Sequence, residues 1–260
     1  MNDAKTFSRS LLSLTQLNEL KIEVDIDSPS LWEALYGLNI KRLSLSASFG
    51  VFSVNSKELF CRSLLSLTQL ESLSVSVSEE SPDLCEALLG LNIKTLSLCG
   101  GWDCFWVNDA KTLSRSLSSL TQLNELKIEV EIDSPSLWQA LCGLNIKRLS
   151  LSGMRKGIRV NYKELLCRSL LSLTQLETLS INVSAESPCI FVALHGLNIK
   201  SLILSGLEGG SGVNREESMS ESLSSLKQLE KLSIRVSKDS PGLWRALRGL
   251  NFRSLSYVVG

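Results

Sequence analysis

The sequence repeats itself every 53 residues, and this periodicity constrains the fold more than any other feature. The segment Ser-Leu-Thr-Gln-Leu, or a close copy, ends at Leu17, Leu70, Leu123, Leu176 and Leu229, so each step is 53 residues. A fixed period of this length is typical of arrays in which similar units stack on their neighbours and together bury a continuous core. We therefore expect one solenoid over residues 1–260, built from five 53-residue repeat pairs.

Each repeat pair contains two shorter repeats of the form Leu-x-x-Leu-x-Leu, with Ile allowed in place of Leu. Leu17–Ile22 is a copy of the first type, and Ile40–Leu45 is a copy of the second. The second leucine of each copy marks the series Leu20, Leu43, Leu73, Leu96, Leu126, Leu149, Leu179, Leu202, Leu232 and Leu255. The spacings alternate between 23 and 30 residues, which gives ten repeats.

This pattern resembles the leucine-rich repeat family, and the alternation of two repeat types resembles its ribonuclease-inhibitor-like branch. That branch includes the recognition ends of NACHT-type innate immune receptors. The resemblance implies an α/β fold, a curved right-handed solenoid with ten parallel strands and helices on the convex side. It also implies a non-catalytic recognition or protein-interaction scaffold, with innate immune ligand sensing among its roles. The asparagine that usually follows the strand in this family is absent, and Asp25, Ser78, Glu131 or Ser184 stands near that position.

The local pattern within each repeat agrees with this fold. Leu20 and Ile22 alternate with polar residues, which indicates a strand with one buried face. Ser28 and Pro29 then provide a helix cap and a first-turn residue, and Gly37 provides a helix end. The sequence therefore predicts a helix between Ser28 and Gly37, and the same pattern recurs in later repeat pairs.

The repeat pairs differ most in one short stretch. Residues 2–46 and 108–152 differ at only five positions, whereas the eight residues that follow each of them share only the final Val. We call the four such stretches, residues 47–54, 100–107, 153–160 and 206–213, the variable segments. One interpretation is drift in loops that carry no load. The contrast between constant scaffold and variable segments favours a second interpretation, in which the segments form a rim that has diversified to recognise partners. Drift would also change exposed helix positions, and loops on a rigid scaffold often carry binding residues.

The predicted ligand- or partner-binding residues all lie in these segments. They are Phe49, Phe52, Trp102, Phe105, Trp106, Arg155, Lys156, Arg159 and Glu208. Tryptophan is enriched at binding hot spots, which favours the cluster in residues 102–106. The alternatives are that one or two of these aromatic residues cover the edge of the core, and that the basic residues belong to a solvated loop.

The outward side chains of the predicted strands form a weaker candidate surface. Most are hydroxyl-bearing in the second and fourth repeat pairs, where Ser72, Ser74, Thr178 and Ser180 are examples. The first and third repeat pairs carry charges, and we expect Glu19 to pair with Arg42, and Glu125 with Arg148, across adjacent strands. A second row of mostly alternating charge is Lys41, Glu71, Lys94, Lys147, Glu177, Lys200, Glu230 and Arg253. It predicts mutual neutralisation rather than a ligand site.

The sequence offers no constellation typical of an enzyme. Its one histidine, His195, occupies a position held by Tyr36, Leu89, Cys142 or Arg248 in the other repeat pairs. A general base needs neighbours that orient it, and this position shows none. The glycine-rich stretch 209–212 lacks the lysine of a phosphate-binding loop, and no Cys-x-x-Cys pair suggests zinc. We therefore predict that the protein is not an enzyme and has no cofactor and no metal site.

Composition limits the class of binding partner and the cellular compartment that we expect for the protein. The 27 basic and 27 acidic residues give no net charge, which predicts a protein partner or a microbial ligand rather than nucleic acid. No apolar run reaches the roughly 18 residues that span a bilayer, so we expect no membrane insertion. Seven scattered cysteines favour a reducing compartment, hence the cytoplasm, while the sequon Asn182-Val183-Ser184 keeps an extracellular location open.

The last repeat bears on whether the protein associates with other chains. Residues 252–259 are rich in strand-forming residues, and an exposed edge strand invites pairing with another chain. We therefore expect a homodimer or higher oligomer, or a part of a longer receptor whose neighbouring segments cover this edge. The corresponding alternative function is a structural, self-associating repeat array without a dedicated ligand.

Overall fold

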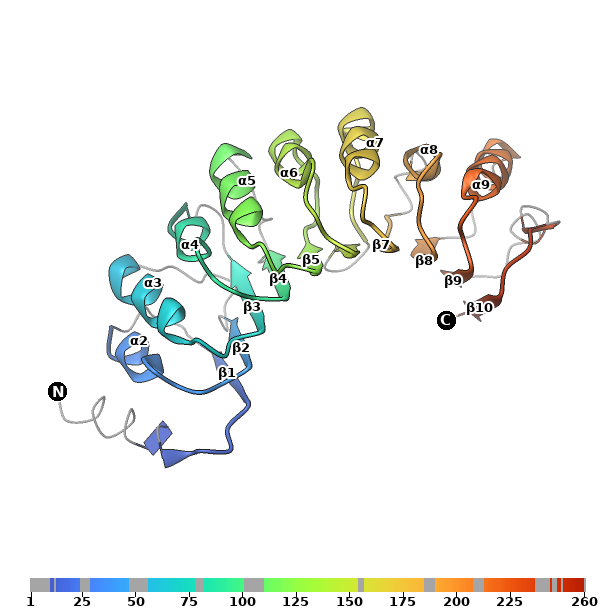
Figure 1. Cartoon of the computed structure of the whole chain (residues 1–260). Helices are drawn as coiled ribbons and strands as arrows, with labels where there is room; N and C mark the ends of the chain where they lie inside the picture. Colours follow the sequence, from blue (N-terminus) through green and yellow to red (C-terminus); the bar gives the residue numbers. More distant parts are fainter. Residues whose placement is uncertain are drawn as a thin grey trace. The chain divides into compact units, whose positions relative to one another are not determined.

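The computed structural model describes residues 10–11, 13–23, 29–46, 56–77, 82–100, 110–153, 157–184, 190–207, 213–236, 244, 247–248 and 250–259. The chain divides into two compact units, Met1–Asn124 and Glu125–Gly260. In each unit parallel strands alternate with helices, and the helices cover one face of the strands (Figure 1).

The first unit contains four strands in sequence order. Its elements are β1 (Glu19–Glu23), α2 (Pro29–Leu35), β2 (Arg42–Ser46), α3 (Lys57–Ser66), β3 (Ser72–Val77), α4 (Pro82–Ala87), β4 (Thr95–Gly100) and α5 (Ala110–Ser119). Each strand pairs in parallel with the next, and the marker leucines Leu20, Leu43, Leu73 and Leu96 lie in register.

The second unit repeats this arrangement with six strands. Its elements are β5 (Glu125–Glu129), α6 (Pro135–Leu141), β6 (Arg148–Ser152), α7 (Lys163–Ser172), β7 (Thr178–Asn182), α8 (Ile190–Leu194), β8 (Ser201–Leu207), α9 (Val213–Ser225), β9 (Lys231–Val236) and β10 (Ser254–Val259). The strands again pair in parallel and in order, and Leu126, Leu149, Leu179, Leu202, Leu232 and Leu255 share one register. The predicted fold, ten parallel strands with helices between them, is confirmed for the described residues.

The core lies between the strands and the helices of each unit. Leu149, Leu179 and Leu202 are 1% exposed or less, as the leucine spacing predicts. The helix signals also behave as predicted in α6: Ser134 precedes the helix and its hydroxyl accepts a hydrogen bond from Leu137 N, and Gly143 follows it with a φ of 75°. Trp138 completes this layer with a fully buried indole.

Buried serines connect the helices of neighbouring repeats. The hydroxyls of Ser63, Ser116 and Ser169 donate to the carbonyl oxygens of Trp32, Cys85 and Trp138, respectively. Three residues further on, Ser172 accepts from Gly143 N at 2.9 Å and donates to Ser169 O. We call this set the serine ladder. It supplies donors to carbonyl groups in the last turn of the preceding helix, which have no N–H donor within that helix.

Among the described helices, none combines the length and apolar character that crossing a membrane requires.

Candidate ligand-binding face

Of the nine predicted binding residues, only Arg159 belongs to the part of the chain that the structure describes. The other eight, Phe49, Phe52, Trp102, Phe105, Trp106, Arg155, Lys156 and Glu208, lie outside the described residues. Their role in binding stays a prediction, and so does that of Arg159.

The second half of the variable segment 153–160 is part of the scaffold. Ile158 is fully buried and bridges in parallel to Val183, while Arg159 bridges to Ile132. The backbone N–H of Ile158 donates to Asn182 O at 2.8 Å, and that of Arg159 donates to Glu131 O at 3.0 Å. The backbone therefore crosses the ends of two strands, and the Arg159 side chain is half-buried there.

Glycine is required where this segment approaches its neighbour. Gly157 has a φ of +80°, and a Cβ placed on it would lie 2.4 Å from the carbonyl carbon of Val183. A Cβ on Gly153 would lie 2.3 Å from the backbone of Gly157. Both positions exclude a side chain in this segment, although Ala47, Val51 and Cys104 stand at equivalent positions of other variable segments.

A buried carboxylate holds the end of the same segment. Asp133 is 1% exposed, and it accepts hydrogen bonds from Trp138 Nε1 at 2.7 Å, Asn161 N at 2.7 Å and Tyr162 N at 3.0 Å. The first bond fixes the start of α6, and the other two fix the chain just before α7. Sequence analysis missed this residue, although an acidic residue precedes Ser-Pro in every repeat pair, at Asp27, Glu80, Asp133, Glu186 and Asp239.

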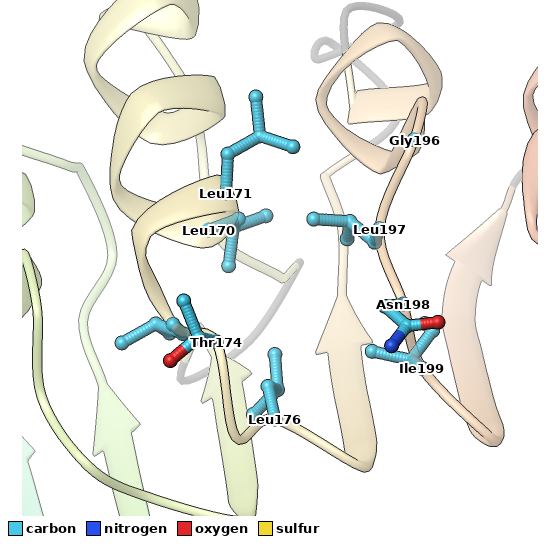
Figure 2. A pocket seen from close by; sticks show the side chains of 9 residues that line it. Leu170, Leu171, Thr174, Leu176, Gly196, Leu197, Asn198 and Ile199 are labelled. Carbon is cyan, nitrogen blue, oxygen red and sulfur yellow. The ribbon is translucent and has the colours of Figure 1, made fainter.

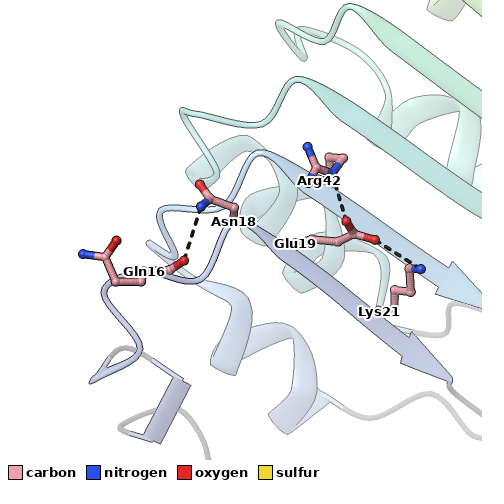
Figure 3. Close-up of polar contacts among 5 residues, drawn as sticks. All are labelled: Gln16, Asn18, Glu19, Lys21 and Arg42. Carbon is pink, nitrogen blue, oxygen red and sulfur yellow. Dashed lines mark hydrogen bonds and ion pairs between the residues drawn. The ribbon is translucent and has the colours of Figure 1, made fainter.

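The strand side chains that point away from the helices form a surface that we call the open face. On β1 and β2 it is charged: Arg42 Nε donates to Glu19 Oε2 at 3.0 Å, and Lys21 Nζ lies 3.2 Å from Glu19 Oε1 (Figure 3). The hydrogen bonds from Arg42 and Lys21 lower the pKa of the Glu19 carboxyl. The predicted pair of Glu19 with Arg42 is confirmed, and it neutralises this part of the face.

The same arrangement recurs on β5 and β6. Arg148 Nε and Lys127 Nζ each lie 3.0 Å from an oxygen of Glu125. Partial burial of Glu125 favours its neutral form, but the hydrogen bonds from Lys127 and Arg148 outweigh this and lower the pKa of the carboxyl. The predicted pair of Glu125 with Arg148 is thus confirmed.

The turns before the strands carry the second charge row. Lys94 pairs with Glu71 at 3.2 Å, Lys200 with Glu177 at 3.4 Å, and Arg253 with Glu230 at 3.3 Å. These pairs confirm the predicted neutralisation for six of the eight residues in the row. Pairs this exposed contribute about 0–1 kcal/mol each, so they set local charge more than stability.

The open face changes character from β6 to β9. This part of the face contains the hydroxyls of Ser150 on β6, Ser180 on β7 and Ser233 on β9. Ile203 of β8 lies between Ser180 and Ser233, and 39% of its surface is exposed. On β9 the exposed side chains are Lys231 and Arg235. This part of the face therefore combines hydroxyls, one aliphatic side chain and two cations.

A hollow of about 270 Å³ lies on the other side of the second unit, between α7 and residues 196–199. In it the side chains of Leu170 and Leu197 point toward each other, and Leu171 stands at the outer edge, 54% exposed (Figure 2). Its lining is Leu170, Leu171, Leu173, Thr174, Leu176, Gly196, Leu197, Asn198 and Ile199. The lining has no titratable or nucleophilic side chain other than one threonine hydroxyl, so this hollow offers no catalytic chemistry.

Groups that could support catalysis or metal binding do not gather in the described part of the chain. It contains no group of three or more His, Cys, Asp and Glu side chains that could hold a metal ion. His195 is exposed after the end of α8, and burial raises the pKa of the Cys167 thiol, which disfavours the reactive thiolate. Ser184 of the sequon is 4% exposed, whereas the acceptor Asn182 is half-buried on β7.

The comparisons with known proteins concern structure alone. No protein-family model and no curated protein matches the sequence. The chain is similar to the leucine-rich repeat-containing protein LegL7 from Legionella pneumophila, with a TM-score of 0.63 and 18% identity over 97% of this chain and 86% of that one. It is also similar to TLR13, solved as a TLR13–ssRNA13 complex, with a TM-score of 0.59 and 19% identity over 96% of this chain. The chain spans only 33% of the TLR13 chain. Together with the ten strands in leucine register, these likenesses show that the chain has the leucine-rich repeat fold.

Proposed function

We propose that the protein is a non-catalytic recognition scaffold that binds a protein partner or a microbial ligand. One observation carries this proposal: residues 2–46 and 108–152 are nearly identical, yet the variable segments that follow them are unlike. The four variable segments begin at or directly after the carboxyl ends of β2, β4, β6 and β8. Strands that run parallel in one sheet end at the same edge, so the segments of each compact unit leave from one side of it. Loops gathered in this way on a rigid scaffold suit binding.

Within this recognition function, the specific role that we propose is innate immune ligand sensing. The resemblance of the repeat alternation to NACHT-type receptors supports it, and so does the fold shared with TLR13, whose structure contains an RNA. Within this proposal, the variable segments and the open face together contact the ligand. The aromatic residues Trp102, Phe105 and Trp106 act as its anchors.

The test is a pull-down that compares the intact protein with a variant in which the variable segments are exchanged among the repeat pairs. In residues 153–160 the exchange keeps Gly153, Gly157, Ile158 and Val160, because the scaffold needs them. A second variant replaces Trp102, Phe105 and Trp106 with Ala. Both should lose partners that the intact protein retains, with unchanged helix content by circular dichroism.

A matched control alters the helix layer instead. Glu164 and Arg168 are exposed on α7, and their replacement by Ala should leave the captured partners unchanged. Unchanged capture by the segment-exchanged protein would contradict the proposal. Unfolding of the triple aromatic variant would show that those residues belong to the core.

The second candidate function, a self-associating structural array, is favoured by β10. Leu255 and Val259 lie in register with Leu232 and Val236 of β9, which are buried, yet they are 45% and 51% exposed. Light scattering at micromolar concentrations tests it: a monomer mass independent of concentration contradicts self-association. Exchange of the variable segments should leave any assembly intact, which separates the two functions.

A further inference from the structure

Ile203 differs from the residues at the equivalent positions of the other repeat pairs. The equivalent residues on the open face are Ser44, Ser97, Ser150 and Ser256, one in each of the other repeat pairs. Serine therefore suffices for the scaffold at this position. An isoleucine that is 39% exposed adds apolar surface that the fold does not use, and such surface is stabilised when a partner covers it.

The strand beside Ile203 reverses the charge found at the equivalent positions of β1 and β5, and β3 and β7 are neutral at these positions. Lys231 stands where β1 and β5 have Glu19 and Glu125, and Arg235 stands where they have Glu23 and Glu129. Within the described residues, no ion pair includes Lys231 or Arg235, whereas the neighbouring turn residue Glu230 is paired with Arg253. Two exposed cations on one strand thus remain available to an anionic partner.

The register places these three side chains in a fixed pattern. Ser201 lies opposite Lys231 and Ile203 lies opposite Ser233, so Ile203 is level with the midpoint between the two cations. Lys231 and Arg235 are four residues apart, or about 13 Å along the strand. An extended chain presents every second side chain to one side. It would match this surface with an acidic, an apolar and an acidic residue at alternating positions.

We propose that the open face of β8 and β9 binds an extended protein segment of the pattern acidic-x-aliphatic-x-acidic, where x is any residue. Its two carboxylates pair with Lys231 and Arg235, and its aliphatic side chain packs on Ile203. Hydroxyls at Ser180, Ser201 and Ser233 border the contact and exchange hydrogen bonds with the polar edges of the segment. This inference deepens the proposed recognition function and rests on it.

A protein segment fits this surface better than a nucleic acid does. Single-stranded nucleic acids bind by stacking their bases on aromatic side chains along a basic groove. No described aromatic residue lies on the open face of β5–β9, where the apolar contact is aliphatic. The charge of the same surface between β5 and β6 is moreover neutralised by Glu125.

The experiment uses the full chain and a fluorescent heptapeptide, Thr-Glu-Thr-Leu-Thr-Glu-Thr, with its ends blocked. Fluorescence polarisation should show saturable binding. Ile203→Ser, which installs the residue of the four equivalent positions, should weaken it by about tenfold. Lys231→Glu with Arg235→Glu should weaken it by about tenfold or more. Lys147→Glu, at an exposed lysine in the turn before β6, should leave it unchanged.

Two further probes complete the design. A peptide with Lys in place of both Glu residues should not bind the wild type, and it should gain binding to the doubly reversed variant. A single-stranded RNA of mixed sequence should bind the wild type and the variants equally weakly. Thermal melting of each variant verifies that the fold is retained.

Three results would overturn the inference. One is failure of the acidic peptide to bind the wild type at millimolar concentration, and another is equal binding to the reversed variant. The third is RNA binding that depends on Lys231 and Arg235, which would assign the surface to nucleic acid. None of these results bears on the capture of partners through the variable segments, so the proposed function is tested separately.

Discussion

The carboxylate of Asp133 accepts a hydrogen bond from the indole Nε1 of Trp138 at 2.7 Å, and both side chains are buried. The same carboxylate accepts the backbone N–H groups of Asn161 and Tyr162, which precede α7. Tyr162 provides no side-chain cap for that helix. A carboxylate from one repeat therefore holds the backbone that leads into the helix of the next repeat.

We expect Asp133→Ala to be strongly destabilising, because Asp133 is a buried carboxylate. It removes the acceptor of one buried donor, the Trp138 indole, and of two partly buried backbone N–H groups, and we expect a loss of about 3–5 kcal/mol in the free energy of unfolding. Urea denaturation measures this loss. Glu177→Ala is the matched control, because it removes a carboxylate from an exposed ion pair with Lys200 and should cost less than about 1 kcal/mol. Equal costs would show that the buried bonds of Asp133 contribute little.

The serine ladder predicts a second, smaller effect. Ser169→Ala removes the hydroxyl that donates to Trp138 O, and we expect it to lower the free energy of unfolding by about 1–2 kcal/mol. Ser224 is exposed on α9 and donates to Ser220 O within its own helix, so Ser224→Ala should change stability by less than about 0.5 kcal/mol. If denaturation gives the two variants the same stability, the bond between helices is not a stabilising one.

Two glycines with similar backbone angles should respond differently to alanine. Gly206 and Gly196 have φ values of +76° and +77°, but only at Gly206 would a Cβ meet another group, the carbonyl oxygen of Val183 at 2.2 Å. Gly196→Ala should therefore cost about 1 kcal/mol, from backbone strain alone. Gly206→Ala should cost clearly more, because the strand must also move. Thermal melting of both variants decides this, and a smaller loss at Gly206 would contradict the close approach.

The pairing of Glu125 predicts a pH-dependent contribution to stability. Because Lys127 and Arg148 lower its pKa in the folded state, the ionised carboxylate stabilises the fold above the ordinary glutamate pKa of about 4.3. That contribution is lost as the pH falls through the lowered pKa. Wild type should exceed Glu125→Gln by up to about 1 kcal/mol at pH 7, and the two should converge in acid. A difference that persists in acid would point to packing rather than charge.

Much of the fold could be predicted from the sequence, because the leucine periodicity reports burial directly. Leu149 and Leu202 are buried where the spacing predicts, and Ser134 with Pro135 begins a helix as their propensities indicate. The pairing of Glu19 with Arg42 could also be predicted, since opposite charges on adjacent strands of known register must meet.

The roles of Asp133 and Ser169 could not be predicted in the same way. Both are polar residues whose burial depends on a partner about thirty residues away, and the sequence around each of them does not identify that partner. Arg159 shows a related difficulty: it lies in a variable segment, yet its backbone pairs with Ile132. Ile203 is an exposed aliphatic residue in a strand, and its significance appears only when the register shows Ser180 and Ser233 on either side.

The contact of Asp133 with Asn161 and Tyr162 also bears on how such a chain can be lengthened. Asp133 belongs to one repeat pair, and the two residues that it holds lead into α7 of the next. Recombination that inserted or removed a single repeat of 23 or 30 residues would leave a carboxylate facing the wrong loop. The acid before Ser-Pro recurs at every 53-residue step, so the addition of a whole repeat pair keeps an acid at the position that Asp133 occupies. For this contact the repeat pair, rather than the single repeat, is therefore the unit that can be added without loss.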